Sequence, residues 1–299
     1  NTDALGAGPV VKAGTPNVPA INLSPVGYPG LNVKVSGAGT NNITVSTGGN
    51  TTYLDGDYSA FTGVWNIGVA AASGAGKARM NGRDNAAPTI IVRTNATVMF
   101  NSGTYAHNAT VVLQGGNTGE SFGQLRIENN AVQNSPVILA NDISDPANDG
   151  LLGSTSGNGT INGVISDANG PHPVTKMGNG TLVLTGANTY AGKTWVKAGT
   201  LWASSLKNAG EPSALGAPTE AANLPTRVGN VTSTVTLSYR GTGDTTAREI
   251  EMGGSTGPTY LDQSGSGPLR LEGNITVANA GNKQLRLQGS VLGATGEVA

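Results

Sequence analysis

The sequence predicts an all-β protein that folds as a right-handed parallel β-helix, a solenoid with glycine- and asparagine-rich turns. Short segments alternate apolar and polar residues, as half-buried strands do. A glycine-bracketed motif returns every 16–21 residues, which is typical of solenoids. Of 299 residues, 46 are glycine and only 12% are charged, so the fold must accommodate many tight turns and few surface charges.

The alternation identifies individual strands and the direction of their side chains. In the segment 181–184, Leu182 and Leu184 should face the core, and Val183 should face away from it. The same half-buried pattern is expected in segments 33–35, 269–271 and 285–287.

The short repeat sets an expected turn length. The motif at 178–186 is a strand between glycines, and its glycine-led core recurs at 159–163, 199–201, 267–273 and 283–289. At about 20 residues per turn, the chain would form twelve to fifteen turns, each covering the apolar face of the next.

A longer repeat lies over the short one. Segment 123–130 matches segment 267–274 at an offset of 144 residues, and further matches occur at 138 and 140. We therefore expect residues 31–299 to form a β-helix with about two copies of a super-repeat of roughly 140 residues. Leu125 and Ile127 should occupy the places of Leu269 and Leu271 in the core. The second copy stops early, which predicts that the native protein continues past Ala299.

Residues 1–30 differ from the rest of the chain. They contain five prolines, which cannot donate the ladder hydrogen bonds of a regular turn: Pro9, Pro16, Pro19, Pro25 and Pro29. This composition predicts a Pro-rich extended arm, lying along the solenoid or reaching a neighbouring chain, or a linker from a preceding repeat.

One stretch resembles a known family. Lys176-Met-Gly-Asn-Gly-Thr-Leu-Val-Leu-Thr-Gly186, continued to Leu201 and by Ser213-Ala-Leu-Gly216, resembles the autotransporter-associated β-strand repeat of secreted bacterial proteins. The resemblance implies a right-handed parallel β-helix displayed outside the cell, and it implies no catalytic residues. Neither a signal peptide nor an outer-membrane barrel accompanies the repeat, so the export route stays open.

Composition excludes several classes of function. A formal net charge of -1 gives no electrostatic reason to expect nucleic acid or an anionic membrane as partner. No stretch reaches the roughly 18 apolar residues of a membrane span. The absence of cysteine excludes a disulfide framework and a cysteine nucleophile.

Candidate catalytic residues are few. His107 and His172 are the only histidines, lie 65 residues apart and are expected on exposed loops. Segment 74–77 resembles a phosphate-binding loop, but Ala78 stands where the motif requires a hydroxyl. We expect no catalytic, cofactor or metal site, and no enzyme.

Paired carboxylates were considered because some β-helices cleave glycans. Asp55 and Asp57 flank Gly56 and are better explained by a turn. The acidic segment 142–149 could hold a cation but is more simply a loop. Glu249 and Glu251 form the last pair.

Five aromatic residues have two interpretations. They could form an exposed stripe for stacking sugars, or they could pack inside the coil. Packing is favoured because Trp65 and Trp195 recur in similar sequence contexts. The five are Tyr58, Trp65, Tyr190, Trp195 and Trp202.

Three functions remain open. The first is an extracellular scaffold, a stalk or filament on the bacterial surface that joins neighbouring repeats end to end. The second is an adhesin that binds a glycan or a cell surface through segments 68–90 and 203–230; within the latter, 203–224 is expected to be a long loop with at most one helical turn. The third is a carbohydrate-active β-helix enzyme, which would need a unique group of acids.

Overall fold

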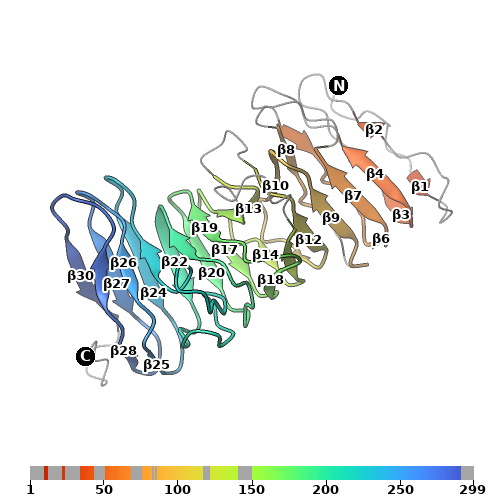
Figure 1. Ribbon diagram of the computed structural model, residues 1–299. Helices are drawn as coiled ribbons and strands as arrows, with labels where there is room; N and C mark the ends of the chain where they lie inside the picture. Colours follow the sequence, from red (N-terminus) through yellow and green to blue (C-terminus); the bar gives the residue numbers. More distant parts are fainter. Residues whose placement is uncertain are drawn as a thin grey trace.

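The computed structural model of the chain is an all-β solenoid of about 9 turns, as predicted (Figure 1). Named strands pair only in parallel across the described residues. The structure describes residues 10–12, 22–23, 34–43, 51–68, 76–82, 84, 86–116, 122–140 and 150–290. These ranges contain no helix, and so none long and apolar enough to cross a membrane.

Each turn contributes strands to three sides. The first side is a ten-stranded sheet that runs through most of the stack. Its strands are β5 (Thr51–Tyr53), β8 (Gly76–Arg79), β10 (Ala96–Phe100), β13 (Leu125–Ile127), β16 (Leu151–Gly153), β19 (Val174–Met177), β21 (Thr194–Val196), β23 (Thr226–Val228), β26 (Ile250–Met252) and β29 (Ile275–Val277).

The second side contains an eight-stranded sheet. Its strands are β11 (Ala106–His107), β14 (Val132–Gln133), β17 (Asn158–Ile161), β20 (Thr181–Leu184), β22 (Gly199–Ala203), β24 (Val235–Tyr239), β27 (Thr259–Gln263) and β30 (Leu285–Gln288). Towards the N-terminus, a three-stranded sheet takes this place in the chain order, with β1 (Val10–Lys12), β3 (Val35–Gly37) and β6 (Ala60–Phe61).

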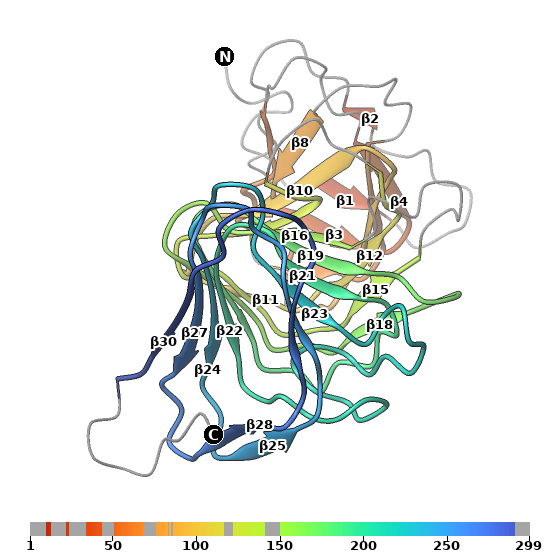
Figure 2. The same ribbon diagram turned by 60° about the vertical axis from the view of Figure 1, so that its left-hand side comes forward.

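The third side is divided as well. A seven-stranded sheet holds β2 (Asn22–Leu23), β4 (Thr40–Ile43), β7 (Val64–Ile67), β9 (Thr89–Val92), β12 (Thr110–Leu113), β15 (Val137–Leu139) and β18 (Ile165–Asp167). A separate two-stranded sheet of β25 (Asp244–Thr246) and β28 (Leu269–Leu271) follows it. Figure 2 shows β22, β24, β27 and β30 along one side of the turns and β25 with β28 along another.

Side chains of one kind stack in columns through the core. The predicted alternation in β20 is confirmed, since Leu182 and Leu184 are buried and Val183 is half-buried. Leu182 is in register with a leucine in each of the next four strands, namely Leu201, Leu237, Leu261 and Leu287. Each fully buried leucine contributes about 2 kcal/mol through the hydrophobic effect.

Turn length differs from the prediction. Thr175 pairs with Trp195, 20 residues later, but Trp195 pairs with Arg227, 32 residues later. The strands keep one register while the corner loops vary in length, so the motif spacing matches only the shortest turns. The stack therefore has about 9 turns rather than twelve to fifteen.

The expected equivalence of the two Leu-x-Leu motifs is wrong. Leu125 and Ile127 lie in β13 of the ten-stranded sheet, whereas Leu269 and Leu271 lie in β28 of the two-stranded sheet. Strands β13 and β29 are six turns apart and begin 150 residues apart, at Leu125 and Ile275. An offset of 144 residues falls short of whole turns and lands on the preceding side. Leu269 is nevertheless buried, and Leu271 packs partly against the core.

Part of the N-terminal segment joins the solenoid. Within residues 1–30, β1 pairs with β3 and β2 pairs with β4, both in parallel. The prolines of this segment lie outside the described residues, so the extended arm stays a prediction.

The long segment 203–224 is a loop without a helical turn, and it closes over the core. Leu206 and Leu215 are buried within the hydrophobic core. The buried Arg248 donates to the carbonyl oxygens of Leu215 at 2.8 Å and Gly216 at 3.1 Å. The loop is thus part of the solenoid body.

A lysine interrupts one apolar column. Lys176 is 1% exposed and lies in register between Leu152 and Val196. Its Nζ donates to the carbonyl oxygens of Gly178 and Gly180 at 2.6 Å, and to that of Ala198 at 2.8 Å. These bonds tie the corners of successive turns together, while burial lowers the pKa of Lys176 to about 7.

The first prediction concerns close packing of adjacent turns. A Cβ on Gly192 would lie 2.1 Å from the carbonyl carbon and oxygen of His172. Gly192→Ala should lower the free energy of unfolding by about 1–3 kcal/mol, measured by urea denaturation. Gly170→Asn is the control, because a Cβ there meets nothing within 4 Å and asparagine tolerates its positive φ. Equal stability of Gly192→Ala and wild type would contradict this packing.

The second prediction concerns pH. Because the folded state lowers the pKa of Lys176 to about 7, the unfolded chain holds a proton that the folded chain lacks from about pH 7 to about 10.4. The free energy of unfolding should therefore rise with pH, by up to about 1.4 kcal/mol per unit. Burial raises the pKa of Tyr58 and Tyr190, which act only near pH 10 and above, so denaturation is measured from pH 6.5 to 9.5.

Lys176→Met should lose this rise and remain folded at pH 7, because it replaces a buried charge with an apolar chain of similar length. Lys34→Met removes an exposed lysine and should keep the wild-type pH dependence. A Lys176→Met protein with an unchanged pH dependence would show that another group is responsible.

Candidate functional site on the outer faces

Two tryptophans of one turn lie on either side of a corner. Trp195 belongs to β21 in the ten-stranded sheet, and Trp202 belongs to β22 in the eight-stranded sheet. Both alternate with buried neighbours, point outward and are half-buried. The outer faces at this corner therefore present the large aromatic surface that a ligand could contact.

The Trp195 cluster is strongly basic. The Arg227 guanidinium lies 4.6 Å and the Lys197 Nζ 5.1 Å from the ring centroid. The indole Nε1 donates to the Gly229 carbonyl oxygen at 2.8 Å. Glu251 pairs with Lys193 at 2.8 Å. Cations and a backbone bond thus hold this ring.

The Trp202 cluster is more polar. The Arg240 guanidinium lies 4.4 Å from the Trp202 ring centroid, and its Nε donates to the Ser238 hydroxyl at 2.9 Å. The buried Asp262 carboxylate accepts from Ser238, from Arg240 and, at 2.8 Å, from Ser264. The network fixes Arg240 over the ring.

Register explains why these pairs recur. Trp195 is in register with Arg227, and Tyr260 is in register with Arg286, whose guanidinium lies 5.4 Å from the Tyr260 ring centroid. Near the other end of the solenoid, Tyr53 is in register with Arg79, at 4.2 Å. An arginine on a later turn thus covers an aromatic ring on the turn before it, which links the turns from outside.

The predicted aromatic set separates into two groups. Tyr58, Trp65 and Tyr190 are fully buried, and the Trp65 ring centroid lies 5.0 Å from that of Tyr58. The packing interpretation is confirmed for these three. The predicted equivalence of Trp65 and Trp195 is wrong, because Trp65 points inward from the seven-stranded sheet and Trp195 points outward from the ten-stranded one.

The histidines are not exposed, contrary to the prediction. His107 lies in β11, stacks on Phe100 with ring centroids 3.9 Å apart, and places Nδ1 3.5 Å from the buried Asp84 carboxylate. His172 is 3% exposed because Gly192 of the next turn packs directly against its backbone. Loop residues in a solenoid become buried when a neighbouring turn covers them.

The acidic candidates have separate structural partners. Asp55 pairs with Arg79, and Asp57 accepts from the backbone N–H of Ser59 at 3.0 Å, which confirms the predicted turn. Glu251 pairs with Lys193, as above, and Glu249 accepts from Thr276. Segment 142–149 lies outside the described residues, and within those residues no three His, Cys, Asp or Glu side chains could hold a metal ion.

The glycine-rich segment does not form a described phosphate cradle. Gly76 and Lys77 begin β8 and pair with β10 in the ten-stranded sheet. Residues 74–75 lie outside the described part of the chain.

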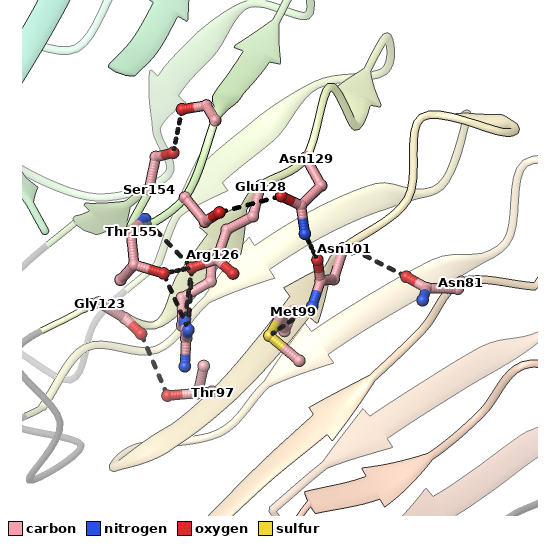
Figure 3. Close-up of polar contacts among 12 residues, drawn as sticks. Asn81, Thr97, Met99, Asn101, Gly123, Arg126, Glu128, Asn129, Ser154 and Thr155 are labelled. Atoms are coloured by element: carbon pink, nitrogen blue, oxygen red, sulfur yellow. Dashed lines mark hydrogen bonds and ion pairs between the residues drawn. The ribbon is translucent and has the colours of Figure 1, made fainter. Parts of the chain in front are cut away.

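A buried ion pair and a row of asparagines connect earlier turns (Figure 3). Arg126 donates to Glu128 at 2.8 Å, and Glu128 also accepts from the Thr155 backbone N–H at 3.1 Å. Alongside, Asn129 bonds to Asn101, whose backbone N–H donates to Asn81 at 2.8 Å. The polar groups drawn in this region therefore bond to one another between turns.

Sequence reasoning did not identify Tyr260, Arg240 or Arg286 as surface candidates. The available signal was alternation: Tyr260 precedes the inward Leu261, and Arg286 precedes Leu287 in the same leucine column. Which aromatic meets which arginine depends on register, and the length of the corner loops conceals that register.

Comparisons with known proteins agree with this architecture. Residues 174–203 match the family model for the passenger-associated-transport-repeat. The chain is 31% identical over 178 residues to the Adhesin BmaC autotransporter of Brucella suis biovar 1 (strain 1330). That match covers 58% of this chain and 5% of the relative, so the chain spans a small part of the relative's length. No solved structure matches the chain.

The matched repeat coincides with the shortest turn of the solenoid. Residues 174–203 contain β19 to β22, with the buried Lys176 and both outward tryptophans. The parallel stack, its register and the sequence match lead to one assignment: the chain is a β-solenoid of the autotransporter passenger type, built from passenger-associated β-strand repeats.

Proposed function

We propose that the chain is a non-catalytic scaffold segment of a secreted bacterial surface protein, a stalk whose turns continue end to end into neighbouring repeats. The observation that supports this proposal most directly is the C-terminal end of the stack. There, four apolar residues are 36–60% exposed: Ile275, Val277, Leu285 and Leu287.

These residues continue inward-facing columns. Val277 is in register with the buried Met252, and Leu287 is in register with the buried Leu261. Each would be covered by one more turn of the same kind. Strand β30 ends the eight-stranded ladder, and such an edge presents unpaired N–H and C=O groups that accept another strand.

Extracellular display is part of the same proposal. Support comes from the passenger repeat match and from the autotransporter relative, of which the chain spans 5%. The absence of cysteine suits a chain that crosses membranes unfolded, because a stray disulfide would obstruct passage.

Adhesion is a second candidate, supported by the name of the relative, an adhesin. The predicted binding loop 203–230 does not favour it, since Leu206 and Leu215 anchor this segment in the core. Segment 68–90 is only partly described. The outward aromatic clusters are a better candidate for contact with a ligand.

An enzymatic function has less support. The acids of the candidate pairs that lie in the described residues are engaged by Arg79, Ser59, Thr276 and Lys193 in separate contacts. A glycan-cleaving enzyme needs two carboxylates that face one substrate bond. The outward clusters contain aromatic rings and cations instead.

The scaffold proposal predicts end-to-end association. At high protein concentration, the wild-type chain should form linear assemblies, because the open end buries its apolar residues against another copy. Leu287→Lys should reduce this association by placing a charge at the open end. Sedimentation velocity measures assembly size, and negative-stain electron microscopy shows its shape.

Val231→Lys is the matched control. Val231 is 59% exposed and Leu287 is 54% exposed, but Val231 lies in a corner loop away from the open end. Val231→Lys should assemble like wild type. Equal loss of assembly in both variants would point to a general effect of charge, and an unassembled wild type at high concentration would count against the end as a joining surface.

A further inference from the structure

Trp202 and Tyr260 share one outward surface of the solenoid. Trp202 lies on β22 and Tyr260 on β27, with β24 between them. Two strand spacings separate them by about 10 Å across the sheet. Trp202 is in register with Ser238 and Asp262, so the Tyr260 position is displaced by two residues along the strand. The rings are thus spaced to contact different units of an extended ligand.

The surface around the rings carries hydroxyl and amide groups. Three threonines in register, Thr181, Thr200 and Thr236, line the sheet beside the aromatic rings. Gln288 follows in register with Asp262 and is exposed. An aromatic platform flanked by hydroxyl and amide groups suits a sugar, whose ring face is apolar and whose edge carries hydroxyls.

The rings are held in place before any ligand arrives. Arg240 covers one face of Trp202 and is itself fixed by Ser238 and Asp262. Asp262 is 7% exposed, so its carboxylate is part of the support rather than a contact for ligand. A fixed platform lowers the conformational entropy lost on binding.

The charge on this surface favours an anionic ligand. Arg286 is exposed and donates to two neutral acceptors, the Tyr260 hydroxyl at 2.6 Å and the Gln284 side chain at 3.2 Å. Among the described residues, no acidic side chain forms a salt bridge with it. A guanidinium of this kind can bind a carboxylate through two parallel hydrogen bonds.

We propose that the outer surface of β22, β24, β27 and β30 binds an extended oligosaccharide that carries carboxylates. Trp202 and Tyr260 stack on its sugar rings, and Arg286 binds a carboxylate. This site rests on the adhesive function proposed above. It does not involve the open end of the stack, so scaffold and binding can be tested separately.

Trp195 provides a matched comparison within the same turn. It is also outward, half-buried and covered by an arginine. However, Lys197 lies near the same ring, the indole N–H is used by Gly229, and Glu251 neutralises nearby cations. Trp195 therefore has the chemistry of a link between turns, without a free guanidinium next to a second platform.

The test measures binding of the full chain to β-1,4-linked mannuronate hexamers and to the carboxyl-reduced, neutral hexamer by isothermal titration calorimetry. Trp202→Ala should weaken binding of both probes by about tenfold, because a stacking platform is lost. Arg286→Gln should weaken only the mannuronate hexamer, by about three- to tenfold, and should remove its dependence on salt. Trp195→Ala should bind both probes like wild type.

Thermal denaturation of each variant confirms that the solenoid is folded during the titrations. Two results would overturn the site. One is a wild-type chain that binds neither hexamer at millimolar concentration. The other is an equal loss of binding in Trp195→Ala and Trp202→Ala, which would make the effect independent of this surface. In either case, the assembly measured with Leu287→Lys would still report on the scaffold.

Discussion

The parallel register between successive turns is the constraint on which the other features of this solenoid depend. Once one strand is placed, every side chain lies about 4.8 Å from its counterpart in the next turn. Inward positions must therefore repeat in apolar character, as in the column that begins at Leu182. Outward positions must tolerate their neighbours, which favours arginine over an aromatic ring, as with Arg227 and Trp195. Asparagines that bond to asparagines, as at Asn101 and Asn129, satisfy the same constraint at the corners.

This constraint separates the residues that hold the fold from those available for function. Most inward side chains belong to columns that lose stability when one member changes, and Lys176 shows that even a buried charge is accepted when three carbonyl groups surround it. Outward side chains carry less of the core energy, so the chemistry of one face can vary while the stack persists. The surface around Trp202 is accordingly a place where recognition can be added to a scaffold without altering its core.

Sequence patterns predicted the class of fold, the facing of Leu182, Val183 and Leu184, and the long loop at 203–224, because each depends on local alternation or on proline. They failed where the outcome depends on the neighbouring turn. His107 and His172 look like loop residues in the sequence, yet another part of the coil covers each of them. The outward cluster was found only in part, since Trp202 was a candidate but its partners Arg240 and Tyr260 come from later turns whose register no spacing rule supplied.

The interruption of two sides has a mechanical consequence. The ten-stranded sheet continues from β5 to β29, whereas the seven-stranded sheet ends at β18 and the two-stranded sheet begins only at β25. A force along the axis is therefore carried mainly by the hydrogen bonds of the continuous sheet. Bending is resisted least where the third side lacks a ladder between Asp167 and Asp244. A stalk of this design has a stiff spine and one compliant flank, so it can curve under shear while its spine remains intact.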